Sequence, residues 1–212
     1  MTHTLHRRGE PESFKGDYIV FTMSAKKINE EGSADKMRRF LEILLDHQPV
    51  NFGDMQTGNG HVKSREEILE NIQSTSIVHA VFTDPAKVAE VLGNLKSEDL
   101  GISVVVTGVH EKTEICCGES GLRKHTVEHS LGIFGRLERL QREEVLQLTT
   151  MCGHGMVPAN LVKKIIGDIR RGKKTVREAA LELTRPCVCG IFNPVRAEYL
   201  LKRLVPLMVL DG

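Results

Sequence analysis

Two short stretches with the same plan constrain the C-terminal part of this chain most strongly. Residues 152–158 read CGHGMVP and residues 187–194 read CVCGIFNP. In both, a cysteine and a second metal-ligand residue two positions later are followed by glycine, two apolar residues and a nearby proline. Since proline favours the first turn of a helix, each stretch predicts a loop that leads into a helix. Two such helix starts packed side by side would bring together Cys152, His154, Cys187 and Cys189.

Three thiolates and one imidazole suit either a tetrahedral zinc ion or an iron–sulfur cluster. The spacing of Cys187 and Cys189 is tighter than the Cys-x2-4-Cys of common zinc sites. A cluster spreads its irons, so neighbouring thiolates need not converge on one point. The sequence therefore favours a [4Fe–4S] cluster on Cys152, Cys187 and Cys189, with zinc on the same cysteines plus His154 as the alternative.

The fourth ligand is open between His154, Cys117 and none. As a ligand His154 would raise the reduction potential, whereas beside an open iron it would transfer protons as a catalytic residue. Hydrogen bonding to loop carbonyls is its structural alternative. Of the adjacent pair Cys116 and Cys117, core packing is expected first, and Cys117 is preferred as a cluster ligand because it lies at a helix end.

His125 and His129 form a second candidate catalytic pair. Their spacing places them on one face of either a strand or a helix. They are expected to bind metal or transfer protons, or else to make separate structural hydrogen bonds. If residues 125–134 are extended, Val127, Leu131 and Ile133 share that face.

The N-terminal part alternates strand and helix patterns. The order is strand, helix, strand, strand, helix, strand, which resembles a ferredoxin-like α+β sandwich in strand order only. The expected strands are residues 18–22, 50–55, 76–82 and 102–106, and the expected helices of this part are 33–46, 64–73, 84–96 and 110–117. Three further helices are expected at 158–171, 175–185 and 193–204.

The expected fold class is thus α+β, with an N-terminal ferredoxin-like sandwich followed by a C-terminal helical metal- or cluster-binding part. Residues 1–16 are expected to be a polar arm, residues 17–140 the ferredoxin-like domain, and residues 141–212 the helical cysteine-containing domain. The boundary falls in a charged stretch that is equally consistent with an exposed helix.

Composition limits the partners. Lys and Arg total 29 against 28 for Asp and Glu, so no net field attracts nucleic acid or an anionic membrane. No apolar run reaches the ~20 residues that cross a bilayer, and no secretory signal is evident. The five cysteines suit reduced thiols better than disulfides. We expect a cytoplasmic protein without nucleic-acid or membrane partners.

The function expected from these features is that of an oxygen-sensitive iron–sulfur protein in an anaerobic or low-oxygen pathway. It would transfer electrons to a redox partner protein, or act as a Lewis-acid or redox enzyme, an oxidoreductase or lyase, on a small molecule between its two parts. The alternatives are a zinc-stabilised interaction or regulatory module without catalysis, and a metal-free ligand-binding domain. Assembly into a homo-oligomer stays open.

Overall fold

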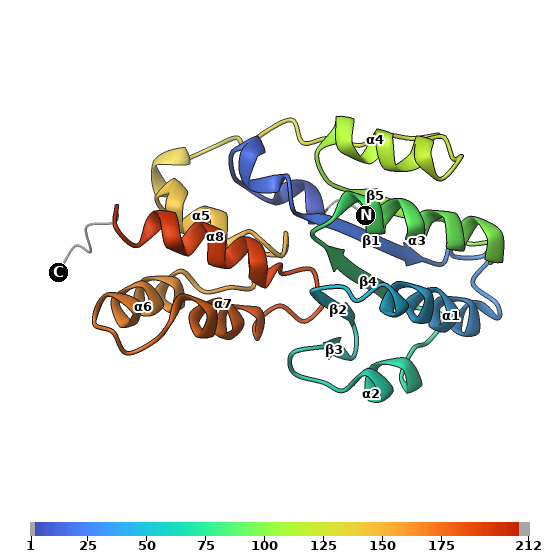
Figure 1. Ribbon diagram of the computed structural model, residues 1–212, viewed down its shortest axis with the longest axis horizontal. Coiled ribbons are helices and arrows are strands. Elements are labelled where there is room, and N and C mark those ends of the chain that lie inside the picture. The colour runs from blue at the N-terminus through green and yellow to red at the C-terminus, as the bar shows by residue number, and fades with distance from the viewer. Residues whose placement is uncertain (1–2, 208–212) are drawn as a thin grey trace.

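The computed structural model describes residues 3–207, which form a mixed α/β fold with a five-stranded antiparallel sheet and eight α-helices (Figure 1). The strands are arranged in the order β3-β2-β4-β1-β5. Their bounds are β1 (Tyr18–Met23), β2 (Asn51–Asp54), β3 (Gly58–Asn59), β4 (Ile77–Phe82) and β5 (Val105–Thr107). The helices are α1 (Ser33–Asp46), α2 (Arg65–Glu70), α3 (Pro85–Glu98), α4 (His110–Glu119), α5 (Glu143–Thr149), α6 (Ala159–Arg170), α7 (Val176–Thr184) and α8 (Pro194–Leu204).

The helix-start signals in the sequence are realised as hydrogen bonds. The hydroxyls of Ser64 and Thr175 each accept a hydrogen bond from the backbone N–H three residues later. The Glu178 carboxylate accepts one from the Thr175 backbone N–H, which completes the capping box of α7. The Asn193 side chain caps α8 in the same way. Pro158 immediately precedes α6 as its cap, so that helix begins one residue later than expected.

The two faces of the sheet carry two different cores because side chains alternate along each strand. On one face, Val20 of β1 and Ala80 of β4 pack among the apolar side chains of α1 and α3. On the other, Ile19, Phe21 and Val81 pack against side chains of the four C-terminal helices. The sheet and the C-terminal helices therefore share one core. Figure 1 shows α5–α8 gathered at the opposite end of the molecule from α1–α3.

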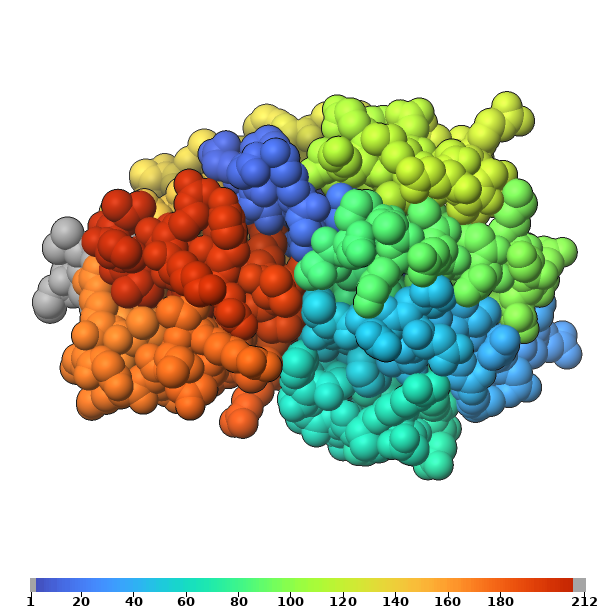
Figure 2. Space-filling view, viewed as in Figure 1, coloured from blue at the N-terminus to red at the C-terminus, as the bar shows by residue number. Residues whose placement is uncertain are grey.

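Residues 3–16 lie against the rest of the chain, with two short 3-10 turns, η1 (His3–His6) and η2 (Pro11–Phe14). Their anchor is the buried carboxylate of Asp17, which binds Arg7 at 2.7 Å and Arg196 of α8 at 3.1 Å. The Arg196 guanidinium also lies 3.7 Å from the centre of the Phe14 ring. In Figure 2 this blue segment lies between the red C-terminal helix and the green part of the chain.

The segment from 125 to 134 contains no strand or helix. Its apolar side chains Val127, Leu131 and Ile133 are exposed, so the shared buried face that an extended segment would provide does not form. The edge strand β5 also starts three residues later than expected and covers only Val105–Thr107. Among residues 3–207, no helix is long and apolar enough to cross a membrane.

Candidate metal centre

The structure brings the two cysteine loops together against the sheet. The Sγ atoms of Cys187 and Cys189 are 3.7 Å apart, and Cys189 Sγ lies 3.6 Å from Nδ1 of His154. The thiol of Cys152 is near enough to that of Cys187 for Cys187 to be the largest influence on its pKa. All three cysteines are buried, whereas His154 is exposed. The group therefore has a buried, sulfur-rich interior with the His154 imidazole on its outer side.

Two of these thiols, those of Cys152 and Cys187, are held in their neutral form. The hydrogen bond with Cys187 and then burial raise the pKa of Cys152 far above its usual range. The bond with Cys152 lowers the pKa of Cys187, but the bond with Cys189 and burial outweigh it and raise that pKa to about 12. A bound cation would reverse this preference, because metal ligation deprotonates a thiol.

Two glycines allow the loops to approach their neighbours closely. Gly190 has φ +81°, and a Cβ there would collide with the backbone carbonyl of Phe52 on β2. Gly153 has φ +73°, and a Cβ there would collide with the backbone carbonyl of His3. Gly155 also has a positive φ, yet a Cβ at this position would meet nothing within 4 Å. The tight contact of the first loop thus falls at Gly153, between the two ligand residues.

Two buried asparagines hold the second loop in place. The Nδ2 atom of Asn59 donates to the carbonyl of Cys187 at 2.5 Å, and Nδ2 of Asn51 donates to the carbonyl of Phe192 at 2.8 Å. The Phe192 N–H in turn donates to Cys187 Sγ at 3.3 Å. Sequence reasoning did not identify this role of Asn59.

Two further histidines lie beside His154 and each other, and sequence reasoning missed both. The His3 ring stacks on that of His154 with centres 4.4 Å apart, and its centre lies 5.5 Å from that of His79 at 83°. Burial, then the nearby His154, lower the pKa of His3 to about 4. Burial also holds the pKa of His79 well below its ordinary value. One feature of the sequence could have identified His79: it is a titratable residue on the same face of β4 as the apolar Ile77 and Val81.

The other predicted site residues lie elsewhere. Cys116 and Cys117 are on α4, in the core on the opposite face of the sheet, where Cys116 Sγ donates to the Pro85 carbonyl at 3.3 Å. His125 and His129 are exposed on an irregular segment, where His125 contacts the hydroxyl of the neighbouring Thr126. The structure therefore does not bring these residues to the three buried cysteines.

In the structure, the side chains of the site contact one another in pairs and do not form a closed shell of metal ligands. Within residues 3–207, no group of three or more His, Cys, Asp and Glu side chains forms a ready-made metal site. Pairs of neighbours, Cys187 with Cys189 and Cys189 with His154, are nevertheless in contact. Closing the shell would require side-chain rotation to bring the remaining donors to the same point.

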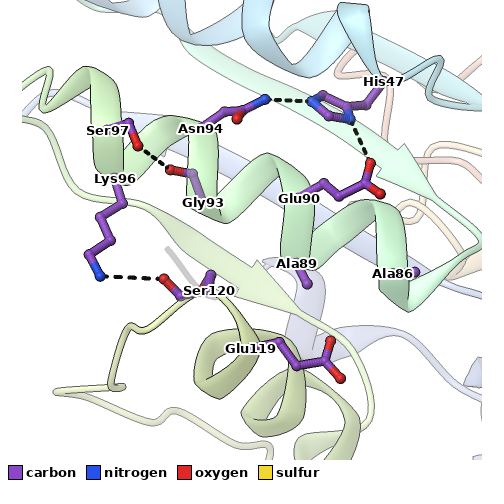
Figure 3. A pocket seen from close by; sticks show the side chains of 10 residues that line it. All are labelled: His47, Ala86, Ala89, Glu90, Gly93, Asn94, Lys96, Ser97, Glu119 and Ser120. Atoms are coloured by element: carbon purple, nitrogen blue, oxygen red, sulfur yellow. Dashed lines mark hydrogen bonds and ion pairs between the residues drawn. The ribbon is translucent and has the colours of Figure 1, made fainter.

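A hollow of about 990 Å³ lies over α3, between the ends of α1 and α4 (Figure 3). These helices cover the face of the sheet opposite the cysteine loops. Most of the hollow's polar side chains already have partners: His47 contacts Asn94 at 2.9 Å and Glu90 at 3.4 Å, and Lys96 donates to the carbonyl of Gly121. Little is left to recognise a ligand. The cysteine loops are the stronger candidate site, since their donor atoms converge from distant parts of the chain.

Comparison with protein-family models, with curated proteins and with solved structures finds no match for this chain. Only the chemistry of the site therefore indicates a function for this chain.

Proposed function

We propose that Cys152, Cys187, Cys189 and His154 bind a single metal ion of the zinc type. The observation that carries this proposal is the spacing of the donor atoms. Zinc lies about 2.3 Å from sulfur and 2.0–2.1 Å from imidazole nitrogen, so a tetrahedral ion holds two sulfurs about 3.8 Å apart and sulfur and nitrogen about 3.6 Å apart. The corresponding distances here are 3.7 and 3.6 Å.

The surroundings of the thiols support the same proposal. Hydrogen bonds from surrounding groups hold a metal ligand in position. Cys187 receives two of them, one to its backbone carbonyl from Asn59 and one to its sulfur from the Phe192 N–H. The exposed His154 is the ligand that water or a small molecule reaches most easily. A site with three buried thiolates and one accessible imidazole is suited to exchange its fourth ligand for a substrate.

A [4Fe–4S] cluster on the three cysteines is the second candidate, and the exposure of His154 favours it. If that histidine moves aside, three thiolates leave one iron open to a small molecule, as a lyase or oxidoreductase of a low-oxygen pathway requires. In a cluster each thiolate binds a different iron, so Cys187 and Cys189 would have to separate beyond their present 3.7 Å. This added rearrangement makes the cluster the second choice.

We also propose that residues 17–140 are a ferredoxin-like sandwich and residues 141–212 the metal-binding part. Leaving out the two-residue β3, the strands follow one another in the chain as β1, β2, β4 and β5, and lie in the sheet in the order β2-β4-β1-β5. The helices α1 and α3 follow the first and third of these strands. This is the connection pattern of the split βαβ unit.

Anaerobic purification followed by metal and acid-labile sulfide analysis tests the function. About one zinc per chain without sulfide is the expected result. Iron with equal sulfide and a brown colour that fades in air would replace the single ion by the cluster. Protein that takes up neither metal, even after reconstitution of the reduced full chain, would overturn both proposals and leave a metal-free module.

A further inference from the structure

His79 is a fully buried histidine whose ring makes no hydrogen bond in the structure. It lies on the central strand β4 opposite Phe21 of β1, with no exposed surface. Both of its ring nitrogens are buried and unpartnered in the structure. A buried polar group left unpaired destabilises the folded state by about 1–3 kcal/mol. The two unpaired ring nitrogens of His79 therefore indicate a position where a ligand could bind.

The nearest candidate partner is His3, which is unpaired in the same way. Its Nε2 atom is buried and unpartnered, and the two ring planes meet at 83° with their centres 5.5 Å apart. Two imidazoles that bind one ion at 2.0–2.1 Å place their ring centres about 5 Å apart. The ring spacing of His3 and His79 is therefore close to that of two histidines sharing a metal ion.

The charge of the neighbourhood favours a cation over an anion. Three thiolates around one divalent ion carry a net charge of −1, and His154 links them to the histidines because it contacts Cys189 and stacks on His3. An anion placed here would be repelled by the thiolates.

We propose that His3 and His79 form a second metal site, which takes a divalent ion of the zinc, cobalt or nickel type beside the cysteine centre. This second site rests on the proposed function, because the negative charge of the cysteine centre favours a cation there. Its ligands, however, are not those of the cysteine centre. The N-terminal segment supplies one ligand and the sheet the other, so this ion fastens residues 3–16 over the site. Two protein ligands leave the remaining coordination positions to water or a small-molecule substrate.

Titration of the metal-free, reduced full-length chain with Co²⁺ tests the second site. The expected uptake is two ions per chain, one with the strong near-ultraviolet absorption of cobalt thiolate and one with only weak visible bands. His3→Ala and His79→Gln should each reduce uptake from two ions to one and keep the thiolate absorption. The matched control His47→Ala, on the far side of the sheet, should still take up two.

The outcomes separate the two proposals. Uptake of a single thiolate-bound ion by the parent protein, or of two ions by both histidine variants, overturns the second site and leaves the cysteine centre standing. Loss of the thiolate absorption in both histidine variants overturns it as well, by assigning His3 and His79 to the first centre. One ion without thiolate absorption that disappears with His3→Ala supports the histidine site and overturns the cysteine centre. Because His3 lies outside the sheet, its variant keeps the test valid even if His79→Gln does not fold.

Discussion

The Nδ1 atom of His154 lies 3.6 Å from Sγ of Cys189, although 35 residues separate them in the chain. Helices α6 and α7 account for this proximity, since they carry the chain away from the first loop and back to the second. Both loops then dock on other elements, Gly153 on the backbone of His3 and Gly190 on that of Phe52. The site therefore depends on the complete fold and not on one local motif.

Replacing single cysteines of the site should abolish metal binding. Cys152→Ser, Cys187→Ser and Cys189→Ser each remove one thiolate, and a buried hydroxyl is a poor zinc ligand. We expect bound metal in the purified variants to fall at least tenfold, measured by elemental analysis of protein purified without oxygen.

Cys116→Ser and Cys117→Ser are the matched controls, because both residues lie on the other face of the sheet. They should retain the metal content of the parent. A loss in Cys117→Ser equal to that in Cys187→Ser would mean that α4 supplies a ligand after all.

Changing His154 to cysteine should preserve the centre and alter its absorption. The substituted thiol would occupy the exposed position of the imidazole, and a fourth thiolate is a stronger donor. With Co²⁺ bound, His154→Cys should show a more intense thiolate band per ion than the parent, whereas His154→Ala should bind the ion more weakly. Spectra and affinities identical to those of the parent in both variants would exclude His154 from the ligands.

Much of the helix and strand pattern was predictable because the relevant signals are local. The capping box at Thr175 and the cap at Asn193 fix helix starts through hydrogen bonds between residues three apart. The buried run around Val20 and Val81 likewise marks strands from composition alone. Residues 125–134 show the limit, since alternation of apolar side chains makes no strand without a neighbouring strand to bind.

The site was predictable only in part, for a physical reason. The two loops repeat a pattern, so their four candidate ligands stand out from the sequence. His3 and His79 have no such repeat, and their proximity arises from the antiparallel pairing of β1 and β4 and from the ion pairs that hold the N-terminal segment. Long-range contacts of this kind leave no trace in local spacing. His125 and His129 are both exposed. Their catalytic role stays a prediction.

Removing the Asn59 amide should weaken the site from outside the ligand set. Asn59→Ala leaves the buried carbonyl of Cys187 without its 2.5 Å hydrogen bond. Unsatisfied buried groups cost about 1–3 kcal/mol, and loss of a group that orients a ligand lowers metal affinity about 10–100-fold. Competition with a chelator measures the affinity, and urea unfolding measures the stability.

The control for this prediction is Asn71→Ala, which removes an exposed side chain that donates to the Glu67 carbonyl. Its stability and metal affinity should stay close to those of the parent. If Asn59→Ala also left the affinity unchanged, the hydrogen bond to Cys187 would have no part in positioning the ligand.

The two loop glycines should respond differently to alanine. Gly155 and Gly190 both have positive φ, which disfavours alanine by about 1–2 kcal/mol. At Gly190 the added Cβ would also collide with the Phe52 backbone, whereas at Gly155 it meets open space. Thermal unfolding should therefore show a much larger loss for Gly190→Ala. Equal losses at the two positions would mean that the second loop does not press against β2.

The buried ion pair between Asp17 and Arg196 should be a major support of the N-terminal segment. The Asp17 carboxylate has no exposed surface and serves both Arg7 and Arg196. Burial lowers the pKa of Arg196 to about 10, and the attraction of Asp17 opposes that shift. Asp17→Asn would thus leave two neighbouring guanidinium groups buried without a counter-charge. Breaking a buried pair on one side destabilises a protein by about 3–5 kcal/mol.

Urea unfolding of Asp17→Asn should show a loss of this size, and limited proteolysis should cut residues 3–16 faster. Glu12→Gln is the control, since its ion pair with Lys15 is more than half exposed and exposed pairs contribute about 0–1 kcal/mol. Because the same segment carries His3, Asp17→Asn should also weaken any metal bound there, while the cysteine centre keeps its thiolate absorption. A loss of stability no larger than that of Glu12→Gln would show that Arg196 is held by the Phe14 ring and the Arg8 carbonyl instead.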